Sequence, residues 1–289
     1  MNVSRSSVKL RMIAIALIGL LGTAVLLVLL IWWQQERIVF QPSGPPFPDA
    51  ATAQRVEYRA SDGQPLFALL VGPDHQPPVG VLIAFHGNAD LAAWRVPWAE
   101  ELARRSGWLV MLAEYRGYGG LPGVPTVAGA RLDARAAAAW ARDSLGLDRP
   151  MALYGHSLGS AVAAELAAEL PVSRLLLESP FTSAREMARI VIARPIAWTW
   201  GLISRVHYDT RARVGSLDIP VSVAHGDQDF VIPVRMGRAV FDAARVPGAL
   251  LIVAGAGHND VSDLGGERYW SWFLSALPAL RGDTLAPPR

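Results

Sequence analysis

The chain has 289 residues, of which 52% are hydrophobic and 18% are charged, and it contains no cysteine. This hydrophobic share excludes an intrinsically disordered chain, and the absence of cysteine excludes disulfide scaffolds, thiolate metal sites and cysteine nucleophiles. The formal net charge is +2, and since Arg5, Lys9 and Arg11 alone contribute +3, the rest of the chain sums to −1. No basic stripe is left to bind nucleic acid, so that class of partner is not expected.

The first predicted element is a long apolar helix. Met12–Trp33 (MIAIALIGLLGTAVLLVLLIWW) contains no charged residue, and as a helix it would cover roughly 33 Å, enough for a hydrocarbon core of about 30 Å. A cleavable signal peptide is the rival interpretation, but its apolar region is shorter and precedes an Ala-x-Ala-like site, which does not follow here. A core helix of a soluble protein would usually show a polar face, which this run lacks. We therefore expect an uncleaved transmembrane anchor over residues 12–33.

The residues that flank this run predict its orientation. The basic residues precede it, and Trp32 and Trp33 stand where interfacial aromatic residues are common. The positive-inside bias then places residues 1–11, a basic tip, in the cytoplasm. It places everything after Trp33 on the non-cytoplasmic face of the membrane, either periplasmic or extracellular.

The rest of the chain is predicted to hold one domain. Residues 34–52 form a linker with a proline-rich stretch at 41–48, residues 53–281 form the domain, and residues 282–289 form a flexible tail. The expected strands are Arg55–Arg59, Pro65–Val71, Val81–His86, Trp108–Glu114, Met151–Gly155, Arg174–Glu178, Val221–His225 and Ala249–Ala254. The expected helices are Leu91–Arg105 (interrupted by Pro97), Val127–Leu145, Leu158–Leu170, Arg235–Arg245 and Ser262–Leu277. This alternation predicts a doubly wound α/β sheet, whose later strands are apolar enough to be buried on both faces.

One insertion interrupts the alternation. Residues 181–217 separate two predicted strands and include a helix-like stretch, Ala184–Val191. Open α/β sheets bind ligands at the carboxyl edge of their strands, so the insertion is the natural candidate for a cap over that edge. Trp198 and Trp200 either line an acyl pocket there or pack the cap.

The pattern G-x-S-x-G, at Gly155–Gly159, follows a buried-strand run and precedes an alanine-rich helix. In that context it predicts a nucleophile elbow, in which the two glycines allow a sharp turn and close packing and so lift the Ser157 hydroxyl above the sheet. The alternative is an ordinary helix start with Ser157 as its N-cap.

A serine nucleophile needs a base, and the base needs a carboxylate that orients it. In chain order the carboxylate follows the serine and the histidine comes last. Among the six histidines only His258 satisfies this order, in a loop after the last predicted strand. Asp227 and Asp229 both follow the preceding strand at its carboxyl end, and spacing alone does not separate them.

Six motifs in a fixed order resemble those of the α/β-hydrolase superfamily. They are H-G-N-A (86–89), E-Y-R-G-Y-G (114–119), G-H-S-L-G (155–159), E-S-P-F-T-S (178–183), H-G-x-x-D-x-x-x-P (225–233) and G-H-N (257–259). The resemblance covers about residues 40–280. It is nearest to the membrane-anchored branch related to monoacylglycerol lipases, serine aminopeptidases and protein depalmitoylases. It implies an α/β-hydrolase fold: a mostly parallel eight-stranded sheet flanked by helices, with a small cap and an N-terminal transmembrane helix.

The resemblance also implies roles for individual residues. It assigns the acid to Asp229, and it places an oxyanion hole at the backbone N–H groups of Leu158 and Asn88. His86 is implied to be a structural loop residue rather than a base. Asp90 departs from the pattern, because relatives often carry a small residue after H-G-N-A.

Some motif residues are expected to be structural. Arg116 is expected to pin a loop, and Tyr115 and Tyr118 are expected to pack. We find no metal-ligand spacing, P-loop or dinucleotide fingerprint in the sequence, so neither a metal nor a cofactor is expected.

These observations predict a membrane-anchored serine hydrolase. The catalytic residues would be Ser157, His258 and Asp229, and the substrate would be a carboxylic ester or thioester, with a small-molecule or lipid acyl group favoured. Two alternatives stay open. One is a serine peptidase or amidase that uses the same residues, and the other is a non-catalytic binding protein that keeps the fold.

Overall fold

The computed structural model describes residues 5–45, 49–73, 77–145, 149–191 and 204–277. The strands are β1 (Gln54–Arg59), β2 (Pro65–Val71), β3 (Val81–Phe85), β4 (Leu109–Ala113), β5 (Met151–His156), β6 (Arg174–Glu178), β7 (Pro220–Gly226) and β8 (Val246–Val253). The helices are α1 (Arg5–Val39), η1 (Ala92–Arg95), α2 (Val96–Ser106), α3 (Val127–Leu145), α4 (Leu158–Ala167), α5 (Ala184–Val191), α7 (Thr210–Val214), α8 (Val234–Asp242) and α9 (Val261–Ala276). Trp198, Trp200 and the predicted tail 282–289 lie outside the described residues.

The strands form one eight-stranded sheet in the order β1-β2-β4-β3-β5-β6-β7-β8. β2 pairs antiparallel with β1 and β4, and the strands from β4 to β8 in this order are parallel. The first two strands form the predicted hairpin about residues 61–63, where Gly63 has a φ of +83° and donates its N–H to Ala60 O. The expected mostly parallel sheet is therefore confirmed, and its six parallel strands all end at one edge.

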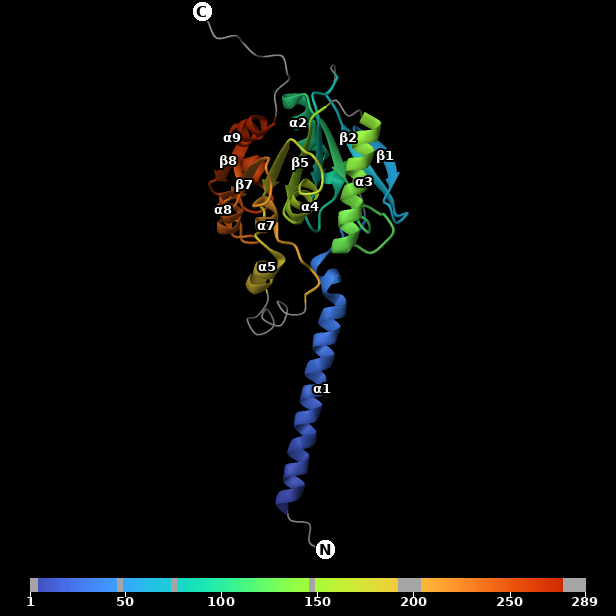
Figure 1. Cartoon of the computed structure of the whole chain (residues 1–289), viewed down its shortest axis with the longest axis vertical. Helices are drawn as coiled ribbons and strands as arrows, with labels where there is room; N and C mark the ends of the chain where they lie inside the picture. Colours follow the sequence, from blue (N-terminus) through green and yellow to red (C-terminus); the bar gives the residue numbers. More distant parts are fainter. Residues whose placement is uncertain (1–4, 46–48, 74–76, 146–148, 192–203, 278–289) are drawn as a thin grey trace, which may run out of the picture.

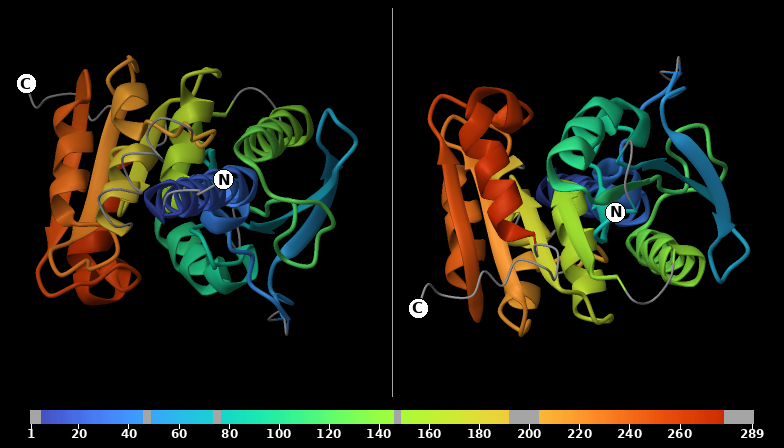
Figure 2. Two further views of the ribbon diagram at one scale, coloured as in Figure 1. Left: turned by 90° about the horizontal axis from the view of Figure 1, so that it is seen from below. Right: turned by 90° about the horizontal axis from the view of Figure 1, so that it is seen from above.

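Helices cover both faces of the sheet because successive apolar side chains of a strand point to opposite sides. Ile83, Leu153 and Leu175 pack in the layer of α3, α4, α7 and α8. Leu82 and Leu176 pack in the layer of α2 and α9, and Figure 2 shows these two helices together on one side of the sheet. These strands are buried on both faces, as their near-continuous apolar runs predict.

Several helices begin, end or bend at residues that the sequence did not predict. The predicted stretch Leu91–Arg105 is divided beside Pro97 into η1 and α2, and Pro97 lies in the first turn of α2, where its missing N–H costs no hydrogen bond. α4 ends at Ala167, three residues before the predicted Leu170. α9 is kinked at Gly266, whose φ is +51°. The five-residue α7 was not predicted.

The N-terminal helix α1 extends away from the domain (Figure 1). It is long and apolar enough to cross a membrane by length and composition, and its most apolar window is not buried. The helix continues beyond the predicted span of 12–33 to Val39, through residues that were expected to form the start of a linker. The side chains of Gln35 and Phe40 are buried against the domain, with 1% and 3% of their surface exposed. The end of α1 is therefore part of the folded domain.

Candidate active site

Ser157 occupies a sharp turn between β5 and α4. Its φ of +53° and ψ of −117° are strained for a residue with a side chain, and its N–H donates to Glu178 O at 3.0 Å. A Cβ atom at Gly155 would overlap the carbonyl oxygen of Gly159, and one at Gly159 would overlap the carbonyl oxygen of Phe85. Both glycines are therefore required for the close packing that the elbow was predicted to need.

The structure brings Ser157, His258 and Asp229 into one hydrogen-bonded series. His258 Nε2 lies 2.9 Å from Ser157 Oγ, and His258 Nδ1 lies 2.7 Å from Asp229 Oδ2. The three side chains come from the β5–α4 turn, the β8–α9 loop and the β7–α8 loop, all at the carboxyl edge of the parallel strands. In this geometry the carboxylate accepts a hydrogen bond from Nδ1–H, and Nε2 is left to accept the serine proton.

The Asp229 carboxylate is fixed by its own loop. Its Oδ1 accepts hydrogen bonds from the backbone N–H groups of Val231 (2.8 Å) and Ile232 (2.7 Å), and its Oδ2 also lies 3.2 Å from His225 Nε2. Burial raises the pKa of this carboxyl, but the hydrogen bonds from His225 and His258 outweigh burial and hold the pKa well below its ordinary value. Asp229 is therefore ionised at neutral pH.

The second candidate aspartate has a different partner. Asp227 Oδ1 accepts a hydrogen bond from the backbone N–H of Gly255 at 2.8 Å, and the residue is exposed. It joins the loops that follow β7 and β8. Of the two aspartates, Asp229 contacts His258.

The two backbone groups expected to form an oxyanion hole come from different elements. Leu158 is the first residue of α4, where the helix dipole favours negative charge. Asn88 lies in the turn after β3, and no described residue accepts a hydrogen bond from its backbone N–H. The next N–H, that of Ala89, donates to Gln41 O at 3.1 Å. The Asn88 side chain accepts from Gln41 N–H and from Tyr118 O–H and donates to Val39 O.

His86 pairs with Glu114 beneath this turn and does not contact Ser157. Its Nε2 lies 2.6 Å from Glu114 Oε1, and its Nδ1 lies 2.8 Å from Gly87 O. Burial lowers the pKa of His86, but the charge and hydrogen bond of Glu114 outweigh burial and raise it. Both ring nitrogens can then donate, which suits two acceptors.

The expected structural residues lie as predicted. Arg116 forms ion pairs with Asp133 of α3 and Asp62 of the β1–β2 hairpin, at 2.7 Å each. Tyr115 and Tyr118 are buried, and Tyr115 O–H donates to His86 O. Arg116 therefore pins a loop, and the two tyrosines support the turn that holds Asn88.

A chain of side chains that was not predicted reaches the backbone of His258. Asp90 Oδ2 pairs with Arg95, whose Nη2 lies 3.2 Å from His156 Nδ1, and His156 Nε2 lies 3.1 Å from His258 O. Burial, together with the charge of Arg95, holds the pKa of His156 well below its ordinary value. The neutral ring accepts from Arg95 at Nδ1 and therefore donates from Nε2 to His258 O. Asp90, the departure from the family pattern, begins this chain.

Replacing His156 with leucine should lower kcat for ester hydrolysis by about 10- to 100-fold with little change in KM, because the His258 loop loses the donor that positions it. His156→Gln should recover much of the rate, since its amide can donate to the same carbonyl. Steady-state kinetics of the two purified variants, with thermal unfolding as a check on the fold, measures this. Equal losses in both variants would show that packing, rather than the hydrogen bond, explains the effect.

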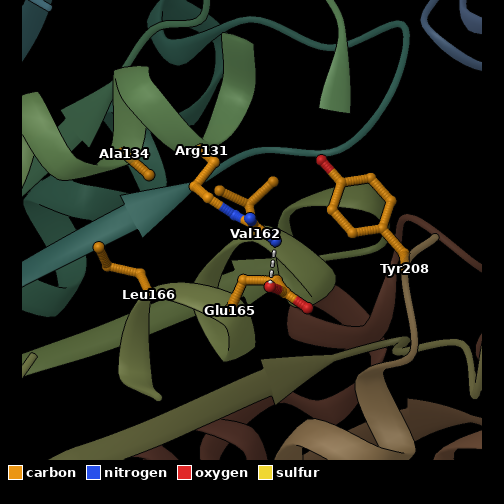
Figure 3. A pocket seen from close by; sticks show the side chains of 6 residues that line it. All are labelled: Arg131, Ala134, Val162, Glu165, Leu166 and Tyr208. Carbon is orange, nitrogen blue, oxygen red and sulfur yellow. Dashed lines mark hydrogen bonds and ion pairs between the residues drawn. The ribbon is translucent and has the colours of Figure 1, made fainter. Parts of the chain in front are cut away.

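A small cavity lies apart from Ser157, between α3, α4 and the segment that precedes α7. Arg131, Glu165 and Tyr208 line it, with three apolar side chains, and Figure 3 shows Arg131 directed toward Glu165. Arg131 Nε and Tyr208 O–H have no hydrogen-bond partner among the described residues. The cavity volume of about 10 Å³ suits one water molecule and no substrate. It is therefore a structural junction.

Sequence reasoning missed several residues that support the site. The pairs His86–Glu114 and Arg95–His156 are 28 and 61 positions apart. No local spacing connects such pairs. Glu114 is the first residue of the motif E-Y-R-G-Y-G and directly follows a buried strand. That position was the one feature of the sequence that could have indicated its part in the site.

Comparison with known proteins places the chain in a family. Residues 80–199 match the family model of the α/β hydrolase fold. The uncharacterized protein Rv2307c of Mycobacterium tuberculosis is 33% identical over 261 residues, which cover 88% of this chain and 90% of that protein. The lysophosphatidylserine lipase ABHD12 of Danio rerio is 30% identical over 181 residues, 57% of this chain and 47% of the lipase. This chain thus matches about half the length of that lipase.

Solved structures agree with the fold. The esterase Pf2001 of Pyrococcus furiosus superposes with a TM-score of 0.67 at 18% identity, over 83% of this chain and 98% of the esterase. The chain belongs to the α/β-hydrolase family, and it is a hydrolase of the esterase and lipase type.

Proposed function

We propose that the protein is a membrane-anchored serine hydrolase that cleaves carboxylic ester or thioester bonds through an acyl-enzyme. The observation that carries the proposal is the series from Ser157 Oγ to His258 (2.9 Å) and from His258 to Asp229 (2.7 Å). In this series the base lies between the serine and a buried carboxylate, which is the arrangement that activates a serine hydroxyl.

In the first half-reaction Ser157 Oγ attacks the acyl carbonyl carbon while its proton moves to His258 Nε2. The N–H groups of Asn88 and Leu158 stabilise the resulting oxyanion, and Asp229 stabilises the imidazolium. The proton on Nε2 then passes to the leaving alkoxide or thiolate, and the carbon–oxygen or carbon–sulfur bond breaks. Water attacks the acyl-enzyme with His258 again as the base, which releases the acid and regenerates Ser157.

A lipid or acylated substrate is the favoured class. The supporting observations are the apolar helix α1 and the similarity to a lysophosphatidylserine lipase over part of its length. We place α1 across a membrane, with residues 1–11 in the cytoplasm and the hydrolase domain, residues 53–281, on the other face. Protease protection of the domain in sealed vesicles would test this orientation, and digestion from the cytoplasmic face would contradict it.

The reaction class is tested with three substrates that share one acyl group: a p-nitrophenyl ester, a thioester and an anilide. We expect the full-length protein in detergent to hydrolyse the ester and the thioester with a kcat/KM at least about 100-fold above that for the anilide, because the amine leaves less readily. A higher rate on aminoacyl anilides would favour a peptidase. If no substrate turned over and no fluorophosphonate probe labelled the protein, a non-catalytic binding role would replace the proposal.

A further inference from the structure

The carboxyl edge of the sheet, which holds Ser157, is also the edge from which α1 leaves the domain. Val39 O accepts from the Asn88 side chain, and Gln41 O accepts from Ala89 N–H, both in the turn after β3. The Glu36 side chain accepts from the N–H of Val127, the first residue of α3. α1 is thus joined to the loops that surround the candidate active site.

No spacer separates the predicted membrane span from this edge. The guanidinium of Arg205 lies 4.4 Å from the centre of the Trp32 ring and donates to Trp32 O at 3.4 Å, and Arg205 N–H donates to Gln35 Oε1 at 2.6 Å. From Trp33 to Val39 the helix rises only about 9 Å. With α1 across a bilayer, these contacts place the edge at the level of the lipid headgroups.

The same edge carries exposed apolar side chains. Of the seven large hydrophobic residues that are exposed among the described residues after α1, six follow the carboxyl ends of parallel strands. They are Trp94, Val124, Ile190, Phe230, Val231 and Leu264. The seventh, Val246, begins β8 at the opposite edge. Phe230 is 91% exposed and directly follows Asp229. Figure 1 shows α5, which carries Ile190, on the side of the domain toward α1.

We propose that this edge rests on the bilayer that holds α1, with Phe230 in the interface, and that the site takes its acyl substrate directly from that leaflet. The substrate class is an ester lipid whose acyl chain lies in the membrane. Exposed apolar side chains of this kind bind where headgroups meet acyl chains, and α1 fixes the edge at that depth. This inference rests on the proposed function for its chemistry, but the position of the edge is independent of catalysis.

The position of the edge is tested with single cysteines, because the natural chain contains none. Phe230→Cys and Val246→Cys are labelled with a polarity-sensitive fluorophore in the full-length protein and reconstituted in phosphatidylcholine vesicles with or without nitroxide-labelled lipids. We expect the label at Phe230 to be quenched at least about threefold more than the label at Val246, because quenching by lipid nitroxides requires contact with the bilayer. Equal quenching at the two sites would overturn the proposal. The proposal would also be overturned if the label at position 230 were shielded from water only by a second copy of the chain and not by lipid.

The substrate route is tested with Phe230→Ser against Val246→Ser as the matched control. Both variants should hydrolyse a water-soluble butyrate ester at the natural rate. On a monoacylglycerol presented in vesicles, Phe230→Ser should be slower by about tenfold and Val246→Ser unchanged, since one interfacial aromatic contact is lost. Equal losses on both substrates would show that Phe230 acts through the Asp229 loop instead. A natural protein inactive on the soluble ester contradicts the proposed function, while the quenching result still reports the position of the edge.

Discussion

Replacing Ser157 with alanine should reduce ester hydrolysis by at least about 10⁴-fold and abolish covalent labelling by a fluorophosphonate probe. The physical reason is the 2.9 Å contact between Ser157 Oγ and His258 Nε2, which provides both the attacking oxygen and the route for its proton. Initial rates on the p-nitrophenyl ester and gel-based detection of the probe measure the two effects on the same preparation.

The fold should survive this substitution, because alanine keeps the Cβ atom that the elbow already accommodates at a φ of +53°. Ser157→Gly provides a second inactive variant. It should be at least as stable as Ser157→Ala, since glycine adopts positive φ values without strain. Melting temperatures of both variants separate loss of chemistry from loss of structure. Labelling that persisted in either variant would place the nucleophile elsewhere.

The parts of the fold that the sequence predicts are those in which local pattern and tertiary environment agree. Runs such as Val81–Phe85 are apolar at every position because both faces of the sheet are covered, so their identity as buried strands was readable. The nucleophile elbow could be predicted for a similar reason. Neighbouring backbone atoms lie so close to Gly155 and Gly159 that no residue with a Cβ atom fits at either position.

The end of α1 shows why other features escaped prediction. Gln34–Arg37 is polar and directly follows the apolar span, and the same composition is typical of a linker. In the structure Gln35 and Glu36 use their side chains to accept from backbone N–H groups of Arg205 and Val127, 170 and 91 positions away. Polar residues whose hydrogen-bond partners are so distant in the chain leave no local sequence pattern from which those contacts could be predicted. The Asp90–Arg95–His156 chain escaped prediction for the same reason.

Replacing Asp229 with asparagine should lower kcat by about 10³- to 10⁴-fold and leave the fold intact. Oδ1 accepts from two backbone N–H groups, of Val231 and Ile232, so the amide oxygen of asparagine is held in that position. Its NH₂ group must then face His258 Nδ1. A donor there forces Nδ1 to accept and puts the ring proton on Nε2, where it blocks transfer from Ser157. Steady-state kinetics on the soluble ester measures the loss.

Asp227→Asn is the matched control for this substitution, because it changes the same functional group two positions away. Its side-chain oxygen can still accept from Gly255 N–H, the one side-chain hydrogen bond that Asp227 makes among the described residues, and it does not contact His258. We therefore expect its kcat to stay within about twofold of the natural value. A large loss in Asp227→Asn with activity retained in Asp229→Asn would reverse the assignment of the acid. Comparable losses of kcat in both variants would show that the loops after β7 and β8, rather than one carboxylate, orient His258.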